Sequence, residues 1–233
     1  MNYKIGIDYG GTKIEGILIN DKGEEILRKR SGYEKNYESG VNTIKNLVEE
    51  FDKHTNSKNS VGVGIPGSSS KENGLIKNAN SIWLNGKPFK KDLEMSLDRE
   101  IKIMNEANCF ALSEAIDGSG ANYNTVWGVI IGSGFGGSFV HNKKVVEGVN
   151  QVAGDWGHQP LPYPSKEEWD LNLKCPVDNC GRPLCAEQFI SGIGFTNIFN
   201  RKYKTNFTTK EIVDLELNGD ERAKKEFDLY EDR

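Results

Sequence analysis

The feature that most constrains the fold is an alternation of apolar and polar residues near the start of the chain. It runs through three segments, Tyr3–Asp8, Lys13–Ile19 and Glu24–Arg30, separated by Gly10-Gly11 and by residues 20–23. A period of two is typical of strands with one buried face, and Gly-Gly or Asn-Asp-Lys-Gly breaks are typical of hairpin turns. The sequence therefore predicts a three-stranded antiparallel meander.

The first turn of this meander has the composition of an anion-binding site. Gly10 and Gly11 leave backbone N–H groups able to point at an anion. Thr12 and Lys13 add a hydroxyl and a cation, and Asp8 at the strand end could hold Mg²⁺ through water. The residues alone are equally consistent with a hairpin turn of purely structural meaning.

A second glycine-rich turn lies further along the chain. The run Thr125–Ile131 is apolar throughout, which predicts a central strand, and residues 132–137 (GSGFGG) separate it from a further strand, Ser138–His141. The dinucleotide-binding fingerprint is excluded, because it requires a helix after the glycines. Two glycine turns that each join a strand to a strand favour an actin-like α/β architecture, in which a nucleotide's phosphates lie between two hairpins.

Polar turns follow the strands expected between these two hairpins. Helical spacing over Gly40–Asp52 predicts a helix that covers the sheet, and Val61–Ile65 predicts a buried strand that stops at Pro66-Gly67 before Ser68. The segment Lys77–Gly86 is rich in amides, which suit sugar hydroxyls because they donate and accept together. An Asn-rich loop that bonds to its own backbone is an equally good interpretation.

One carboxylate stands where a general base could work. A helix around Lys91–Leu97 precedes the strand Ile101–Met104, which ends at Asn105-Glu106 before another helix. A carboxylate at a strand end is well placed to accept a proton from a bound ligand. Glu106 could instead be a helix-start charge favoured by the helix dipole.

A complete set of zinc ligands lies between Gly154 and Glu187. His158, Cys175, Cys180 and Cys185 supply one nitrogen and three sulfurs, the number and type of ligand that a tetrahedral structural zinc requires. The alternative is a disulfide, for example between Cys180 and Cys185, with the third cysteine buried as a small apolar residue. Cys109 lies outside this set, and we expect it to pack in the core.

Composition excludes several classes of protein. A net charge of −4 with scattered basic residues gives no electrostatic footprint for nucleic acid. The N-terminus enters a strand pattern directly, without a signal peptide, and no apolar run is long enough to span a membrane. We therefore expect a cytoplasmic protein. Beyond Glu187, amphipathic helices are predicted at Thr208–Glu216 and Glu221–Tyr230.

Taken together, several of these motifs resemble the ROK (repressor, ORF, kinase) family of bacterial sugar kinases. The matching pieces keep the family's order over residues 3–196: IGIDYGGTKIEG, VGVGIPGS, KNANSIWLNGKPF, NEANCFALSEA, VIIGSGFGGSFV, AGDWGH, the three cysteines with Ala186-Glu187, and FISGIGF. The third piece looks most like the fructokinase and mannokinase branch, with the N-acetylglucosamine kinase branch next. The resemblance implies an actin-like ATPase (ribonuclease H-like) fold with an N-terminal lobe over residues 1–116 and a C-terminal lobe with the zinc loop over 117–233.

The resemblance also implies a reaction, in which a hexose hydroxyl attacks the γ-phosphoryl group of Mg·ATP. Glu106 stands where the family has its catalytic aspartate. The residues implied for the ATP phosphates are Asp8, Gly10, Gly11, Thr12, Lys13, Gly132, Ser133 and Gly134. Those implied for the sugar are Asn105, Asp155, His158 and Glu187, with Gly67, Ser68 and Asn80 as neighbours. His158 would place one ring nitrogen on zinc and the other toward the sugar, which makes the zinc a structural ion.

The chain departs from the family in three ways. Glu106 replaces aspartate and Asp155 replaces glutamate, which moves each carboxylate by about one carbon–carbon bond, about 1.5 Å, in opposite senses. The family also continues past the position of Arg233, through a helix, an adenosine-binding turn and a closing helix. We therefore expect weak ATP binding and a homodimer or association with a missing C-terminal piece. The alternative functions are a non-catalytic sugar-binding ROK protein and an N-acetylglucosamine kinase.

Overall fold

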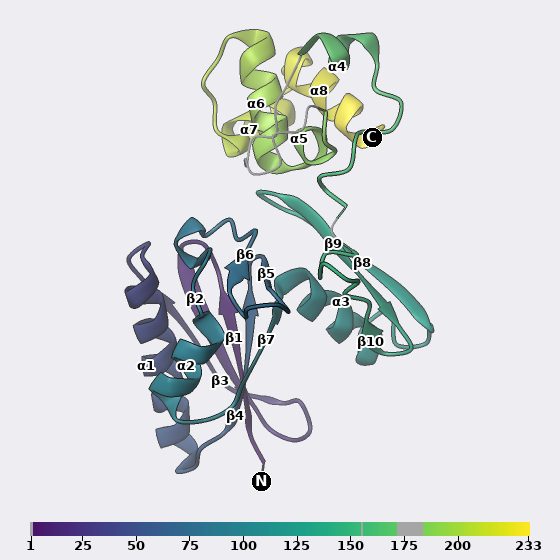
Figure 1. Cartoon of the computed structure of the whole chain (residues 1–233). Coiled ribbons are helices and arrows are strands. Elements are labelled where there is room, and N and C mark those ends of the chain that lie inside the picture. Colours follow the sequence, from purple (N-terminus) through teal and green to yellow (C-terminus); the bar gives the residue numbers. More distant parts are fainter. Residues whose placement is uncertain (1, 155, 172–183) are drawn as a thin grey trace. The chain divides into compact units, whose positions relative to one another are not determined.

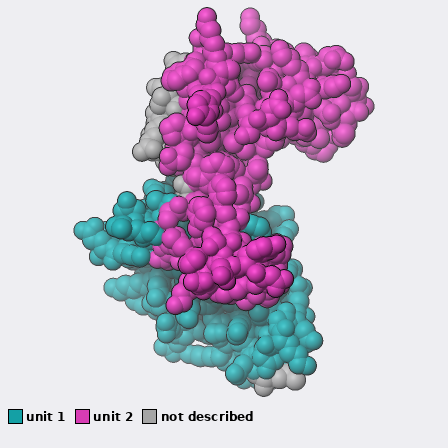
Figure 2. Space-filling view, turned by 90° about the vertical axis from the view of Figure 1, so that its right-hand side faces the viewer, with its two compact units in different colours: residues 1–110, 148–152 teal, residues 111–147, 153–233 magenta. Residues whose placement is uncertain are grey.

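The computed structural model describes residues 2–154, 156–171 and 184–233. These residues form two compact units, coloured separately in Figure 2. Unit 1 comprises residues 1–110 and 148–152, and unit 2 comprises residues 111–147 and 153–233. Asp155, Cys175 and Cys180, which the sequence assigns to the sugar and zinc sites, lie outside the described residues. The division into lobes at residues 116 and 117 stays a prediction.

Unit 1 is built on a five-stranded sheet of order β3-β2-β1-β4-β7. Its strands are β1 (Lys4–Tyr9), β2 (Lys13–Ile19), β3 (Glu25–Gly32), β4 (Ser60–Ile65) and β7 (Ile101–Asn105). The first three are antiparallel, which confirms the predicted meander. β4 pairs parallel with β1, and β7 pairs parallel with β4. The carboxyl ends of β1, β4 and β7 therefore meet at one edge of the sheet.

Two helices cover one face of this sheet, α1 (Tyr37–Thr55) and α2 (Phe89–Leu97), and Figure 1 shows both beside the strands. Their apolar residues pack with the inward residues of β1 and β4 in a single core. Asn36 caps the start of α1 by accepting from the Ser39 N–H, and Asn56 ends the helix in the left-handed conformation. The short elements of unit 1 are β5 (Ser68–Ser69), β6 (Ile76–Lys77) and the 3₁₀ helix η1 (Ile82–Leu84).

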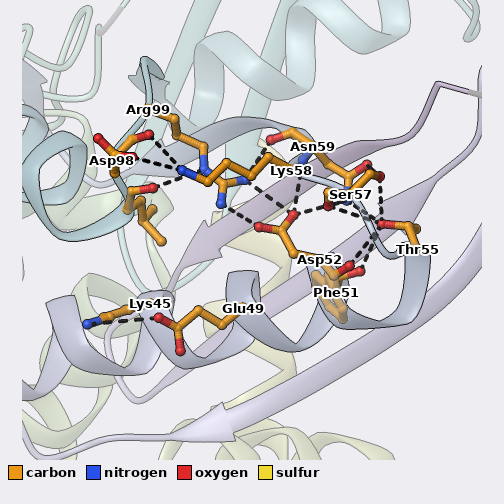
Figure 3. Close-up of polar contacts among 11 residues, drawn as sticks. Lys45, Glu49, Phe51, Asp52, Thr55, Ser57, Lys58, Asn59, Asp98 and Arg99 are labelled. Carbon is orange, nitrogen blue, oxygen red and sulfur yellow. Dashed lines mark hydrogen bonds and ion pairs between the residues drawn. The ribbon is translucent and has the colours of Figure 1, made fainter.

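A polar network fastens the end of α1 to the loops before β4 and β7 (Figure 3). The guanidinium of Arg99 pairs with the carboxylate of Asp52 and donates to the carbonyl of Asn59 at 2.9 Å. The Asp52 carboxylate also accepts from the Asn59 N–H at 3.0 Å. Burial alone would raise the pKa of Asp52, but the bonds from Arg99 and Asn59 outweigh it and lower that pKa. The network therefore joins three segments through one ionised carboxylate.

The helix α3 (Glu106–Ile116) begins in unit 1 and ends in unit 2. Unit 2 contains a three-stranded sheet of order β10-β9-β8, formed by β8 (Thr125–Ile131), β9 (Phe135–His141) and β10 (Lys144–Val145). The prediction that Thr125–Ile131 is a central strand is wrong, because β8 is an outer strand of the described sheet. Its residues Trp127 and Ile131 are exposed. An apolar run indicates a strand that can be buried, and it does not say how many neighbours the strand has.

The rest of the described part of unit 2 carries helices joined by irregular segments, and the two predicted helices near the end of the chain, α7 and α8, are confirmed. The helices are α4 (Lys166–Leu171), α5 (Glu187–Ile190), α6 (Gly192–Tyr203), α7 (Thr209–Leu217) and α8 (Glu221–Glu231). A capping box formed by Thr208 and Glu211 starts α7, and the side chain of Asp220 caps α8. Within the part of the chain that the structure describes, no helix has the length and apolar character needed to cross a membrane.

Candidate functional site

Two predicted site carboxylates occupy the same edge of the unit 1 sheet. Asp8 lies near the carboxyl end of β1, and Glu106 begins α3 directly after β7. Both line one cavity of about 630 Å³. Its lining residues are Gly6, Ile7, Asp8, Glu15, Ile17, Arg28, Gly62, Val63, Gly64, Lys102, Ile103, Met104, Glu106 and Cys109. Cys109 therefore faces this cavity and is only half-buried, which contradicts the expectation of a core cysteine.

Both carboxyl groups have a raised pKa, although both residues are exposed at the cavity surface. Partial desolvation by the surrounding protein is the main cause of the raised pKa of Glu106, and the charge of Asp8 raises it further. Partial desolvation likewise raises the pKa of Asp8, with a second contribution from Glu15 and an opposing one from Arg30. A helix dipole alone would lower the pKa of Glu106, so the direction does not fit a simple helix-start charge. A raised carboxyl pKa suits a general base that works near neutral pH.

The same pair of carboxylates fits a hard divalent cation. Mg²⁺ is usually held by one or two carboxylates together with water and substrate phosphates, and a cation beside Asp8 would favour the ionised form of both carboxyl groups. Within residues 2–154, 156–171 and 184–233, no group of three or more His, Cys, Asp or Glu side chains is arranged to hold a metal. Any Mg²⁺ here would therefore need phosphate oxygens and water in addition to these carboxylates.

The first glycine turn closes the hairpin between β1 and β2, next to Asp8. A Cβ on Gly10 would lie 2.7 Å from the carbonyl oxygen of Lys13, so a side chain would force this turn apart. Gly11 has no neighbour that would meet a Cβ, and it is exposed together with Thr12 and Lys13. The exposed backbone and side chains of residues 11–13 are thus able to meet a ligand.

Asn105 ties the end of β7 to the segment that follows β4. Its amide nitrogen donates to the carbonyl of Gly67 at 3.0 Å, and its oxygen accepts from the N–H groups of Ala107 and Asn108 at the start of α3. Gly67 has φ = +73°, and a Cβ there would lie 2.4 Å from the Lys77 carbonyl oxygen. Asn105 therefore fixes the start of α3 and the position of Glu106.

The amide-rich segment bonds to its own backbone, which is one of the two interpretations left open by its sequence; sugar binding stays a prediction. Asn85 bonds to its own loop, accepting from the Ala79 N–H at 2.9 Å and donating to the Ala79 carbonyl at 3.0 Å. Asn80 is exposed and able to meet a ligand. The buried Oγ of Ser68 has no hydrogen-bond partner among the described atoms, so a ligand hydroxyl or water could satisfy it.

In unit 2, Glu187 lies at the second glycine turn. The turn is closed by a bond from Gly132 N–H to the Gly134 carbonyl, and the carboxylate of Glu187 accepts from the next N–H, that of Phe135, at 2.9 Å. The backbone N–H of Glu187 donates to the carbonyl of Gly157 at 2.8 Å. The two ends of the stretch Gly154–Glu187 therefore meet beside the turn, with Glu187 only 5% exposed.

The structure brings His158 and Cys185 onto neighbouring backbone segments. Pro160 and Cys185 form an antiparallel bridge, and the Ala186 N–H donates to the Gln159 carbonyl at 2.8 Å. Cys185 is fully buried. The other two predicted zinc ligands fall outside the described residues, so the zinc site stays a prediction.

Sequence reasoning missed the residues that surround Asp8 and its turn. The carboxylate of Glu15, the residue paired with Asp8 across the hairpin, forms ion pairs with Arg28 and Arg30. The hydroxyl of Tyr33 donates to the carbonyl of Gly10 at 3.0 Å. The alternation in the meander indicates which of these side chains lie on the same face of the sheet, but it does not indicate which of them are in contact.

Comparison with known proteins assigns the family. The model of the ROK family matches residues 4–233. An N-acetyl-D-glucosamine kinase of Citrobacter koseri is 36% identical over 228 residues, which are 97% of this chain and 75% of that protein. One from Haemophilus influenzae is 38% identical over 221 residues, which are 94% of this chain and 72% of that protein.

Solved structures of this family share the fold. A ROK hexokinase from Thermus thermophilus superposes with a TM-score of 0.80 at 22% identity, covering 96% of this chain and 72% of the hexokinase. A ROK family glucokinase from Streptomyces griseus, solved with glucose and AMPPNP, gives a TM-score of 0.75 at 22% identity over 97% and 74% of the two chains. This likeness establishes an actin-like, mixed α/β fold of the sugar-kinase type. The chain belongs to the ROK family.

Proposed function

We propose that the chain transfers the γ-phosphoryl group of ATP to a hydroxyl of N-acetyl-D-glucosamine or a closely related N-acetylated hexosamine. The observation that carries this proposal is the Asp8–Glu106 carboxylate pair beside a glycine turn, in a chain whose 36–38% identical relatives are named N-acetyl-D-glucosamine kinases. Membership of the sugar-kinase class rests on these relatives and on the shared fold.

The proposed sugar replaces the sequence-based expectation of a fructokinase. That expectation rested on one motif, KNANSIWLNGKPF, which lies in the amide-rich loop. The relatives favour the alternative, an N-acetylglucosamine kinase. Exposed amides such as Asn80 suit any sugar with several hydroxyls, so this loop does not distinguish hexoses by itself.

Glu106 is the proposed base. The sugar oxygen attacks the γ-phosphorus, the bond between that phosphorus and the bridging oxygen of ADP breaks, and the hydroxyl proton passes to the Glu106 carboxylate. The partial desolvation and the nearby Asp8 charge that raise the pKa of Glu106 make its carboxylate a better proton acceptor near neutral pH. Asn105 holds Glu106 in place by capping α3.

The phosphates are proposed to bind at the two glycine turns, residues 10–13 in unit 1 and residues 132–134 in unit 2. Asp8 is the proposed residue toward Mg²⁺, which when bound neutralises charge on the phosphate oxygens. For the sugar we propose Asn105, Asp155, His158 and Glu187, with Gly67, Ser68 and Asn80 nearby. We also propose a structural zinc on His158, Cys175, Cys180 and Cys185, and a homodimer as the assembled form.

A coupled assay of ADP formation tests the proposal. N-acetyl-D-glucosamine, N-acetyl-D-mannosamine, glucose and fructose are compared at equal concentration with Mg·ATP. We expect the highest kcat/KM with an N-acetylated sugar. Glu106→Gln should lower kcat by about 10²- to 10⁴-fold, the usual contribution of a general base, while sugar binding measured by calorimetry persists. Glu106→Asp is the conservative control, and it should retain more turnover than Glu106→Gln.

Two outcomes of this assay would contradict the proposal. Higher kcat/KM with fructose would restore the fructokinase interpretation. Sugar binding without turnover of any of the four sugars would favour the non-catalytic sugar-binding alternative. Calorimetry with Mg·ATP alone separates a loss of nucleotide binding, which we expect to be weak, from a loss of chemistry.

A further inference from the structure

We propose that Tyr9, Tyr33 and Trp83 are positioning residues, which join the Gly10–Gly11 turn to the amide-rich loop through one hydrogen-bonded aromatic cluster. The inference rests on the proposed function, because it concerns how the phosphate and sugar sides of that site are held together. All three residues belong to unit 1 and lie on segments distant in sequence: the end of β1, the loop after β3, and η1.

The first contact of the cluster connects β1 to the loop. The indole Nε1–H of Trp83 donates to the hydroxyl of Tyr9 at 3.0 Å. Tyr9 is 0% exposed, and it is the residue directly before Gly10. Trp83 is half-buried, and the buried Tyr9 hydroxyl costs free energy when it is unpaired, so this bond favours one arrangement of the two segments.

The second contact orients the turn itself. The Tyr33 hydroxyl donates to the carbonyl of Gly10 at 3.0 Å. That carbonyl and the N–H of Gly11 belong to the same planar peptide unit and point in opposite directions. Holding the carbonyl against Tyr33 therefore aims the Gly11 N–H away from the cluster, on the exposed side of the turn where a phosphate oxygen could accept it.

Ring packing joins the two contacts. The rings of Tyr9 and Tyr33 meet edge to face with centroids 5.3 Å apart, and those of Tyr33 and Trp83 are 6.2 Å apart. Such pairs contribute beyond their buried area. Burial, followed by interaction with Tyr33, raises the pKa of Tyr9 although the Trp83 bond opposes this, so the hydroxyl stays protonated at neutral pH. The three side chains thus form one connected unit.

Helix α1 leaves room for the Tyr9 hydroxyl. A Cβ on Gly40 would lie 2.2 Å from the Tyr9 oxygen and 3.0 Å from its ring. Glycine inside a helix is unfavourable relative to alanine, so its presence at a buried position needs a reason. The space it provides is occupied by the end of the Tyr9 side chain. A phenylalanine at position 9 would fill the core equally well but would not need all of this space.

Hydrogen bonds within the loop that carries Trp83 connect this residue to the backbone around Asn80. Gly86 N–H donates to the Ile76 carbonyl at 2.8 Å, and Asn85 bonds to both backbone groups of Ala79. Fixing Trp83 therefore also fixes the backbone next to Asn80, which is the proposed sugar neighbour. Loss of the Tyr9–Trp83 bond should weaken the energetic coupling between sugar and nucleotide, which is reciprocal between the two ligands.

The test uses three hydroxyl or indole deletions in the full chain, Tyr9→Phe, Tyr33→Phe and Trp83→Phe. Tyr37→Phe is the matched control. The Tyr37 ring packs 6.1 Å from Phe89 in the same aromatic region, but its hydroxyl donates to Asp92 at 2.6 Å and contacts neither the turn nor the loop. Each variant is measured by steady-state kinetics, by calorimetry with AMPPNP and sugar, and by amide hydrogen exchange of residues 10–13 and 78–86.

We expect Tyr33→Phe to raise KM for ATP by about three- to tenfold and leave KM for the sugar unchanged, as loss of one neutral hydrogen bond predicts. Tyr9→Phe and Trp83→Phe should raise both KM values and reduce the effect of AMPPNP on sugar affinity by a similar factor. Without ligand, Tyr9→Phe should speed exchange in both segments. Tyr37→Phe should change none of these quantities.

The proposal is overturned if Tyr9→Phe and Tyr33→Phe behave like Tyr37→Phe in both kinetics and exchange, or if Tyr9→Phe loosens only one of the two segments. If the wild-type protein is inactive, only the proposed function is contradicted. Amide hydrogen exchange of the ligand-free chains still tests whether the aromatic cluster links the turn to the amide-rich loop. If Trp83→Phe fails to fold, the two tyrosine variants decide the outcome, because each removes a single oxygen atom.

Discussion

Each unit contains a hairpin in which a glycine turn joins a strand to an antiparallel partner. The sheets that contain the two hairpins differ in size. In unit 1, β1 pairs with β2 on one side and with β4 on the other. In unit 2, β8 pairs with β9, and in the described sheet it stands at the edge. The inward residue Ile7 of β1 is 4% exposed, whereas Trp127 and Ile131 of β8 are 45% and 54% exposed.

This difference shows that the apolar character of a strand does not reveal what stabilises it. β8 is more continuously apolar than β1, yet β1 contributes more to a core, because α1 and α2 cover its inward face. On β8 the ring of Trp127 instead stacks on Phe139 at 5.4 Å and meets Trp156 at 4.8 Å. We therefore expect substitutions in the two hairpins to differ in their effect on the free energy of unfolding.

The largest effect should come from matched truncations in the two strands. Ile7→Ala removes a fully packed side chain and should lower the free energy of unfolding by about 2–5 kcal/mol. Val129→Ala, at a position that is 37% exposed, should cost about 1 kcal/mol or less. Urea unfolding followed by amide exchange assigns each loss to its unit. Equal costs would mean that β8 is covered in solution and that the contrast between the sheets is not real.

The polar network in Figure 3 is the next test, because it stabilises unit 1 independently of the core. Arg99→Met leaves Asp52 without its main partner. The side chains of Arg99 and Asp52 are only 13% and 15% exposed, so the substitution should lower the free energy of unfolding by about 1–3 kcal/mol. The depressed pKa of Asp52 makes this contribution present above pH 3.8 and lost as pH falls through the folded value. The control is Lys58→Met, which removes a neighbouring exposed pair with Asp98 and should leave the free energy of unfolding almost unchanged. A similar loss for both variants would contradict the assignment.

Alanine substitutions of two strand glycines should have smaller effects on stability, in opposite directions. A Cβ on Gly62 of β4 meets nothing within 4 Å, so Gly62→Ala should stabilise unit 1 by about 0.4–1 kcal/mol through the unfolded chain. A Cβ on Gly137 of β9 would lie 2.8 Å and 3.1 Å from the carbonyl oxygens of Gly128 and Gly154, so Gly137→Ala should destabilise unit 2 by about 1–3 kcal/mol. Thermal unfolding of both variants checks the sign. A gain from Gly137→Ala would show that β8 and β9 are loosely paired.

Much of unit 1 follows from local patterns. The meander, α1, β4, α2 and β7 all lie within a few residues of where periodicity predicts them, since each has one buried face and clear breaks. The turn residues Gly10 and Gly11 and the base candidate Glu106 were also evident from their places at strand ends. The end of Thr125–Ile131 was located correctly, but its place in the sheet was not, because strand neighbours are set by long-range pairing.

The contacts that organise the site were not predictable in the same way. Tyr9 lies just past the predicted strand Tyr3–Asp8, and Gly40 is the first residue of the predicted helix Gly40–Asp52, so neither pattern indicates that the two residues meet. Their fit depends on how closely α1 approaches the sheet, a distance that no local pattern contains. The same holds for Trp83 and Tyr33, which are joined to Tyr9 and Gly10 only after the chain has folded.

The smallest expected effect concerns two glutamates on the same helix, Glu106 near its start in unit 1 and Glu114 in unit 2. Partial desolvation and Asp8 raise the pKa of Glu106, so the stability linked to its protonation is present below pH 4.5 and lost as pH rises through the folded value. Glu106→Gln should therefore match the wild type in stability at acid pH and become more stable than the wild type at neutral pH, while losing turnover.

Glu114→Gln is the control. Hydrogen bonds from Ser119 lower the pKa of Glu114, so this variant should instead be less stable than the wild type above pH 4.5 and recover as pH falls. Melting temperatures of both variants and the wild type, measured from pH 3 to pH 8, give the slope of stability against pH and test both expectations. The same slope for the two variants would show that the cavity beside Asp8 does not perturb Glu106, and the proposed base would lose its physical support.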